Sequence, residues 1–183
     1  MWGGVNMFRK QYRFTGTHAD MVNELTAIFD DSAKVRLFEH NYDVYINAPI
    51  IGFLYGRKGM KNTNSEIADQ NIFPEQMINN SDQLIYLFRL ILMLDSDYEP
   101  DEEKRLDKAF REFGKDESDL ALFDSYVLGG VEVLHEKLIE EASGTGDYLN
   151  KLYDFVEECH ERFNEDISTE NILELCRQNL NSN

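Results

Sequence analysis

Apolar residues recur at the three- and four-residue spacing of amphipathic helices along most of the chain. We therefore predict an all-α protein, a single compact domain over residues 1–183 with about six to seven helices. The predicted helices span residues 18–29, a stretch from Asn41 or Asp43 to Tyr55, a stretch capped by Ser81 or Asp82 and ending at Leu94, and residues 101–113, 118–141 and 147–163. A last one is capped by Ser168 or Thr169 and ends near Leu180.

Two stretches depart from the helical pattern. Large and cationic residues alternate in FRKQYRF, residues 8–14, which indicates a short edge strand or an ordered arm. Residues 58–80 are polar and aperiodic, so we expect a long loop carrying one or two short turns. Residues 1–7 are set apart as an expression remnant or a disordered arm.

The segment PIIGFLYGRKGM, residues 49–60, has two readings, a phosphate loop or a closely packed helix. A phosphate loop needs four residues between its first glycine and a Gly-Lys pair, and then Ser or Thr, none of which this segment supplies. On a helix, Gly52 and Gly56 lie one turn apart and let a neighbour approach closely. We predict helix packing at these two positions and at Gly129 and Gly130.

Pro49 leaves two options open within the apolar helix that precedes the long loop. Either the helix continues through the proline with a kink, or Asn47 is the true N-cap and the proline lies in the first turn.

The charge of the chain is large and unevenly distributed. Acidic residues outnumber Lys and Arg by 35 to 18, which gives a net charge of -17. Residues 1–61 hold eight of the basic residues against six acids, so the remaining chain is strongly acidic. Such a surface repels nucleic acid unless its basic residues are segregated. The segregated cations are candidate partner or nucleic-acid contacts: Arg9, Lys10, Arg13, Arg57, Lys58 and Lys61.

Cysteine usage and hydropathy favour a cytoplasmic protein. Cys159 and Cys176 are the only cysteines, and the first residues lack the pattern of a secretory signal. The longest apolar run, residues 84–94, is about half the ~20 residues that span a bilayer, so no membrane association is expected.

Candidate catalytic chemistry is sparse, and no cofactor motif is present. The sharpest pattern is glutamate three residues before histidine, at Glu132 with His135 and at Glu157 with His160. Two such pairs, with two further glutamates, build the carboxylate-bridged metal site of some helical bundles. A chain with 35 acids produces such spacings by chance, so this reading stays an alternative.

Four segments taken in order carry a family resemblance: DVYINAPIIGFLYGRKG at 43–59, NIFPEQMI at 71–78, DQLIYLFRLILML at 82–94 and LFDSYVLGGVEVLHEKL at 122–138. Together they resemble the Dnd system-associated protein 4 family, accessory proteins of bacterial DNA phosphorothioation and its restriction partners. Pro49, the acidic stretch around 95–117 and the helices beyond 147 depart from that pattern. The resemblance implies a small helical protein of an anti-phage defence system, without catalytic residues to carry over.

We therefore expect a non-enzymatic adaptor that binds a larger nuclease, helicase or ATPase of a DNA modification-restriction system through its acidic half. DNA would be associated indirectly, and self-association into a homo-oligomer stays open. The first alternative is an acidic regulator that imitates DNA, and the second is the carboxylate-bridged metal enzyme.

Overall fold

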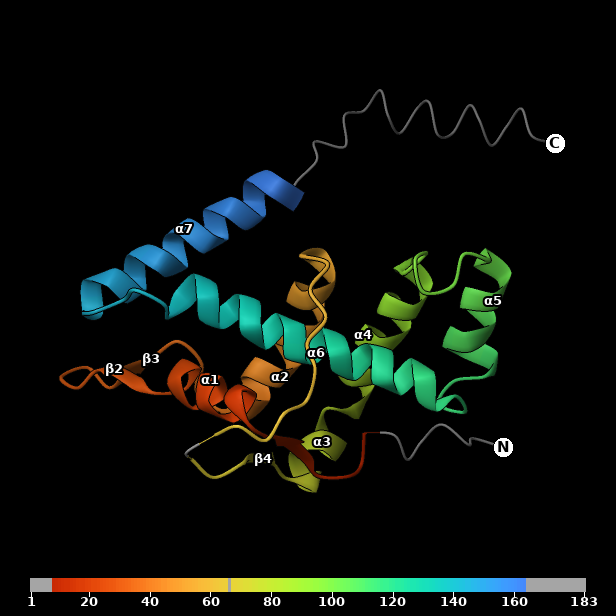
Figure 1. The fold of residues 1–183 in the computed structure, drawn as a ribbon, viewed down its shortest axis with the longest axis horizontal. Helices are drawn as coiled ribbons and strands as arrows, with labels where there is room; N and C mark the ends of the chain where they lie inside the picture. The colour runs from red at the N-terminus through yellow and green to blue at the C-terminus, as the bar shows by residue number, and fades with distance from the viewer. Residues whose placement is uncertain (1–7, 66, 164–183) are drawn as a thin grey trace.

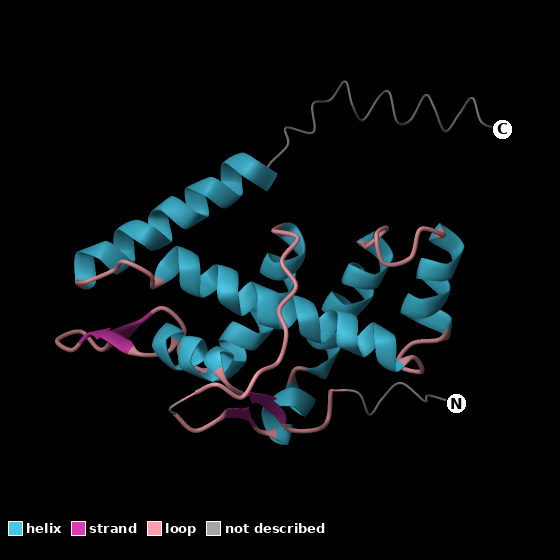
Figure 2. Cartoon of the chain, viewed as in Figure 1, coloured by secondary structure: helices cyan, strands magenta, loops and turns pink. Residues whose placement is uncertain are grey.

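A computed structural model describes residues 8–65 and 67–163 (Figures 1 and 2). The predicted last helix and residues 1–7 lie outside this described part. The elements within it are β1 (Tyr12–Phe14), α1 (Thr17–Leu25), β2 (Ile28–Asp30), β3 (Val35–Arg36), α2 (Asn41–Leu54), β4 (Gln70–Ile72), α3 (Pro74–Asn79), α4 (Ser81–Leu94), α5 (Glu102–Leu106), the π-helical turn η1 (Asp107–Arg111), α6 (Glu117–Leu138) and α7 (Thr145–Phe163).

The chain is mostly helical, as predicted, but it is not all-α. Two small antiparallel sheets accompany the helices: β1 pairs with β4, and β2 pairs with β3. Strand β1 confirms the strand expected within residues 8–14, whereas β4 and α3 lie inside the segment expected to be a long loop. Helix α3 begins at Pro74, where the missing N–H of proline costs least.

The first predicted helix is too long at its C-terminal end. Helix α1 stops at Leu25, and residues 28–30 form β2 instead. The hydroxyl of Thr26 bonds back to the carbonyl of Val22, as side chains at the end of a helix often do. Phe29 then packs against Tyr148 of α7, with ring centroids 5.0 Å apart. A contact more than a hundred residues away thus decides the end of the helix.

Helix α6 is the axis of the fold and crosses α2 near its middle (Figure 1). A Cβ atom added at Gly52 would fall on the carbonyl of Tyr126, and one added at Gly130 would fall on the carbonyl of Ala48. A Cβ at Gly129 would likewise meet the carbonyl of Arg57. The two helices therefore touch through their backbones, which only glycine permits at this distance.

Gly56 does not belong to this crossing, although it was expected to. Its φ is +62°, and an added Cβ would meet nothing within 4 Å. The N–H of Gly56 bonds to the carbonyl of Phe53, and the N–H of Arg57 bonds to the carbonyl of Gly52. These two bonds form a Schellman motif, so Gly56 ends α2.

Gly59 takes the packing role in its place. Its N–H donates to the carbonyl of Ser125 at 2.8 Å, and an added Cβ would lie 2.7 Å from Cβ of Leu128. The chain after α2 therefore lies directly on α6.

Of the two options for Pro49, α2 takes the first, in that the helix continues through the proline. It begins at Asn41, and a capping box joins the N–H of His40 to the carboxylate of Asp43. Pro49 is buried, and the rest of the helix is buried or half-buried apart from a narrow exposed face with Asn47 and Leu54. This explains why α2 has almost no polar face.

The remaining helices pack around this pair and share one hydrophobic core. Helix α1 and the N-terminal part of α7 lie beside α6, and α4 covers the other end of α2 (Figure 1). Phe8 joins the core through edge-to-face contacts with Phe88 and Phe123. Among the described residues, no helix is both long enough and apolar enough to cross a membrane.

The crossing predicts a sharp difference between glycines. Gly130→Ala should lower the free energy of unfolding by about 3 kcal/mol, because its Cβ would overlap the backbone of Ala48. Gly146→Ala should be neutral or slightly stabilising, because open space surrounds that position in α7. Urea denaturation of both variants measures the difference, and equal stability of the two would contradict a backbone-to-backbone crossing.

Candidate functional site

The six candidate contact cations do not form one free basic patch. Four of them have acidic partners: Arg13 with Asp69 at 3.5 Å, Arg57 with Glu136 at 3.2 Å, Lys58 with Asp95 at 3.6 Å, and Lys61 with Asp124 at 2.8 Å. Arg9 and Lys10 are exposed before β1, without an ion pair among the described residues. The cations serve largely to hold the long loop and β1 in place.

Lys58 belongs to a cluster that joins the C-terminal ends of α2 and α4 to the middle of α6. Its ammonium lies 4.8 Å from the ring centroid of Tyr126, and the hydroxyl of Tyr126 donates to the buried carboxylate of Asp95 at 2.7 Å. Burial first, and then the hydrogen bond to Asp95, raises the pKa of Tyr126, so its hydroxyl stays protonated at neutral pH. Asp95 ends α4, and the cluster ties that end to α6.

The residues of the metal alternative have separate partners. Glu132 bonds to the buried His18 at 3.0 Å, and His135 bonds to Glu24 at 2.6 Å, so this pair joins α6 to α1. Glu157 and His160 lie exposed on α7. Over residues 8–65 and 67–163, no three His, Cys, Asp or Glu side chains gather closely enough to hold a metal ion.

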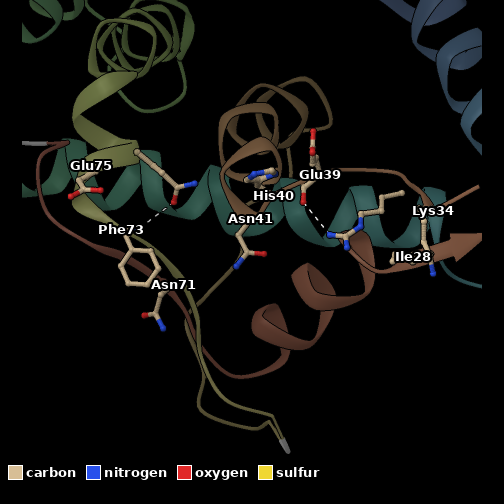
Figure 3. A pocket seen from close by; sticks show the side chains of 10 residues that line it. Ile28, Lys34, Glu39, His40, Asn41, Asn71, Phe73 and Glu75 are labelled. Atoms are coloured by element: carbon tan, nitrogen blue, oxygen red, sulfur yellow. Dashed lines mark hydrogen bonds between the residues drawn. The ribbon is translucent and has the colours of Figure 1, made fainter. Parts of the chain in front are cut away.

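A wide hollow of about 1000 Å³ lies between the β2–β3 hairpin, the start of α2 and the β4–α3 segment (Figure 3). Its lining residues include Lys34, Arg36, Glu39, His40 and Glu75, so its polar lining is of mixed character. All five are exposed, and the guanidinium of Arg36 is directed at the carbonyl of Glu39 (Figure 3). The hollow lacks the desolvated charged group that tunes a catalytic site.

A second hollow has the character of a protein-binding surface. Its volume is about 430 Å³, and its lining is apolar and aromatic with one acid and one arginine. We call it the α4–η1 groove. Its lining residues are Asp82, Ile85, Tyr86, Arg89, Met93 and Phe110. A smaller hollow of about 300 Å³ adjoins it, lined by Glu103, Leu106, Asp107, Phe110 and Arg111. Phe110 lines both, so the two hollows lie next to the same ring.

The sequence of α4 builds this groove directly. Five of the lining residues, from Asp82 to Met93, follow the i, i+3, i+4, i+7 spacing of a single helix face. Its buried residues occupy the opposite face: Leu84, Leu87, Phe88, Ile91 and Leu92. Tyr86 is 64% exposed and Phe110 is 52% exposed, and both line the same hollow, so their apolar surface is contiguous rather than scattered.

Arg89 joins the two walls of the groove. Its Nε donates to the carbonyl of Ala109 at 3.1 Å, and its guanidinium lies 5.1 Å from the ring centroid of Phe110 and 4.8 Å from that of Phe113. Ala109 and Phe110 lie in the π turn, which the bond from the N–H of Glu112 to the carbonyl of Asp107 closes. Phe110 is thus held in its exposed position by a part-buried contact.

Two further cations fix the α5–η1 segment from within. Arg105 donates to the carbonyls of Met93, Glu99 and Pro100 at 2.8 to 3.0 Å, which satisfies the C-terminal end of α4. Lys108 bonds to Asp119, which is fully buried at the start of α6, at 2.8 Å. The groove is therefore built on anchored elements on both sides.

Asp116 completes this anchor and caps α6. Burial opposes the charge of Lys108, yet its hydrogen bonds to Asp119 and Asp116 prevail and raise its pKa. The hydroxyl of Ser118 and the ammonium of Lys108 lower the pKa of Asp116 to about 2. Both groups are charged at neutral pH.

Comparison with known proteins finds no match: no family model fits the chain, and no curated sequence or solved structure is significantly similar to it. The site must therefore be interpreted from its own geometry. Sequence reasoning selected the glycines and the cations, but it missed Tyr86, Arg89 and Phe110. The available signal was an apolar helix, residues 84–94, with Arg89 and Tyr86 on one face.

The Lys108 anchor gives a stability prediction. Lys108→Met should lower the free energy of unfolding by about 3 kcal/mol, because it leaves the carboxylate of Asp119 buried without its cation. Lys104→Met is the matched control, since Lys104 is exposed on the neighbouring turn and should change stability by less than about 0.5 kcal/mol. Chemical denaturation compares them, and a Lys108 variant as stable as the control would show that the buried pair is not an anchor.

Asp116 gives a pH prediction with a defined sign. Because its pKa is lower in the folded protein than the usual ~3.9, its carboxylate stabilises the fold above about pH 4. This contribution is lost as the pH falls towards 2. Asp116→Asn keeps the helix cap but removes the charge, so the variant should be less stable at pH 7 and should converge with the wild type in acid.

Urea midpoints of the wild type and of Asp116→Asn at pH 7, 4, 3 and 2 measure this gap. Asp97→Asn, which removes another exposed carboxylate of the same segment, is the control. A gap between the wild type and Asp116→Asn that stays constant over this range would contradict the assignment.

Proposed function

We propose that this protein is a non-enzymatic adaptor that binds a larger protein through the α4–η1 groove. The observation that carries the proposal is the pair of exposed rings, Tyr86 and Phe110, set around the stacked guanidinium of Arg89. Tyrosine and arginine are enriched among the residues that dominate binding energy at protein interfaces. An apolar hollow with a charged rim is the usual form of such a surface.

The anchoring of the groove supports the same proposal. Arg89, Arg105 and Lys108 hold its walls before any partner arrives, so little conformational entropy is lost on binding. The groove also lies within the acidic part of the chain, the half expected to contact the partner. Neither this groove nor the larger hollow holds a nucleophile paired with a base, which favours binding over catalysis.

The resemblance to the Dnd system-associated protein 4 family supplies the setting for this adaptor. In that setting the partner is a nuclease, helicase or ATPase of a bacterial defence system, and the protein acts in the cytoplasm. Four of the six candidate cations are already paired with acids, so the adaptor associates with DNA through its partner rather than directly.

A DNA-imitating regulator is the second candidate. The observation that favours it is the set of exposed carboxylates between residues 97 and 117: Asp97, Asp101, Glu102, Glu103, Glu112, Asp116 and Glu117. Such a protein would occupy the DNA channel of its partner by charge alone. It would not need exposed aromatic rings, and for this reason we favour the adaptor.

Co-purification tests the adaptor. The tagged full chain is expressed in its native host, and the proteins retained are identified and quantified by mass spectrometry. Tyr86→Ala should reduce a stoichiometric partner at least tenfold, since truncating an aromatic residue at the centre of an interface costs about 2 kcal/mol. Tyr153→Ala is the matched control, because Tyr153 is 66% exposed, on α7, and should retain the partner.

The same experiment separates the two candidates. If Tyr86→Ala retains the partner as well as the wild type does, and excess duplex DNA releases it, the protein imitates DNA and the adaptor proposal is wrong. Loss with Tyr86→Ala and no release by DNA is the outcome expected of the adaptor.

A further inference from the structure

We infer that the segment of the partner seated in the α4–η1 groove is a basic amphipathic helix. This inference rests on the proposed function and deepens it by naming the chemistry of the ligand. Three features of the groove carry it: its shape, its apolar lining and the sign of the free charge around it.

The shape suits a helix. Along α4, the lining runs from Asp82 to Met93, eleven residues apart, or about 17 Å at 1.5 Å per residue. The second wall is the α5–η1 segment, which packs beside α4, and the adjoining hollow extends the groove past Phe110 to Leu106. A hollow lined by about three turns of one helix, with a second helical segment beside it, is the form that receives an amphipathic helix.

The lining supplies apolar contacts at several points along this length. Ile85, Met93 and Phe110 line the main hollow, and Leu106 lines the adjoining one and is 44% exposed. Methionine adapts its shape to different apolar side chains, which suits a groove that receives a helix face. An incoming helix would place residues at i, i+3, i+4 and i+7 against this row.

The free charge at the rim is negative. Asp82 and Glu103 are exposed and have no ion-pair partner among the described residues. Of the cations of the groove, Arg111 is paired with Asp107 at 2.6 Å, and Arg89 keeps its charge but lies 5.1 Å and 4.8 Å from the ring centroids of Phe110 and Phe113. The charged lining residues of the two hollows are three acids and two arginines, so their sum is negative.

The same sign extends beyond the rim. Residues 95–119 hold eleven acids against five bases, and Arg105 and Lys108 of those bases face inward. The field around the groove therefore favours a helix flanked by Lys and Arg.

Charge also argues against a second copy of this chain as the occupant. The apolar face that another copy could offer is the exposed stripe of α7: Leu149, Leu152, Tyr153 and Val156. Asp154, Glu157 and Glu161 lie beside that stripe, so it would bring acids against the acidic rim. Nucleic acid is disfavoured for the same reason.

Fluorescence anisotropy with the full chain tests the inference. The probe is a labelled 18-residue peptide with Leu at i, i+3, i+4 and i+7 and with Lys and Arg at the remaining positions. The comparison peptides are a scrambled one of the same composition and one with Glu in place of Lys and Arg. The ordered basic peptide should bind at least tenfold more tightly than either of them.

Variants of the chain test whether the peptide binds in the groove. Tyr86→Ala should weaken peptide binding at least tenfold, and Tyr153→Ala should leave it unchanged. Asp82→Asn combined with Glu103→Gln should reduce the dependence of peptide binding on salt. Equal binding of the scrambled peptide, or no effect of Tyr86→Ala, would overturn the inference, because the binding would then be charge attraction alone. Self-association of the chain, seen by sedimentation and abolished by Tyr86→Ala, would overturn it in favour of a second copy.

The two proposals fail in different ways. If the native partner is lost with Tyr86→Ala but cross-links to the groove through a segment that is not a basic helix, the adaptor stands and this inference fails. If the partner is retained with Tyr86→Ala, the adaptor itself fails at this surface.

Discussion

The backbone-to-backbone crossing of α2 and α6 is the constraint on which the rest of the structure depends. With glycine at 52 and 130, the two helices approach more closely than side chains would permit, and Gly129 lets the chain just past α2 lie on α6 in the same way. The larger side chains beside the crossing then interlock, as Phe53 and Tyr126 do with ring centroids 5.5 Å apart. Helix α2 becomes largely buried, and α1, α4 and α7 pack against the pair that results.

Tyr126 connects the crossing to the α4–η1 groove. Gly52 packs against the backbone carbonyl of Tyr126, and the hydroxyl of Tyr126 bonds to Asp95 at the end of α4. Lys58, which follows the Schellman motif of α2, lies over the same ring and pairs with the same carboxylate. The end of α4 is thus positioned by the central pair of helices, and Arg105 and Lys108 then fix the segment that forms the other wall of the groove.

Local patterns predicted the long helices because their apolar spacing reflects which side faces the core. The patterns predicted α2, α4, α6 and α7, and they placed Gly52, Gly129 and Gly130 in helix packing. The end of α1 could not be predicted, since it depends on Phe29 meeting Tyr148. The π turn η1 could not be predicted either. Its contacts with Arg89 come from α4, and no pattern within residues 107–111 indicates them.

Spacing also cannot tell a core face from a binding face. On α7 the apolar stripe of Leu149, Leu152, Tyr153 and Val156 has the pattern of a buried face, yet Phe155 is the residue that enters the core. Helix α4 likewise has apolar residues on more than one side, and the helices that pack against it determine which side is buried. Tyr86 therefore lines a groove and does not enter the core.

The acidic composition acquires a specific meaning from the direction in which the cations point. Two of the five bases of residues 95–119 do not face solvent: Arg105 bonds to backbone carbonyls, and Lys108 bonds to the buried Asp119. A third, Arg111, is exposed but paired with Asp107. Because Arg105 and Lys108 stabilise the fold from within, the exposed carboxylates outnumber the exposed cations around an apolar groove. A groove of this kind selects its ligand by shape and charge together.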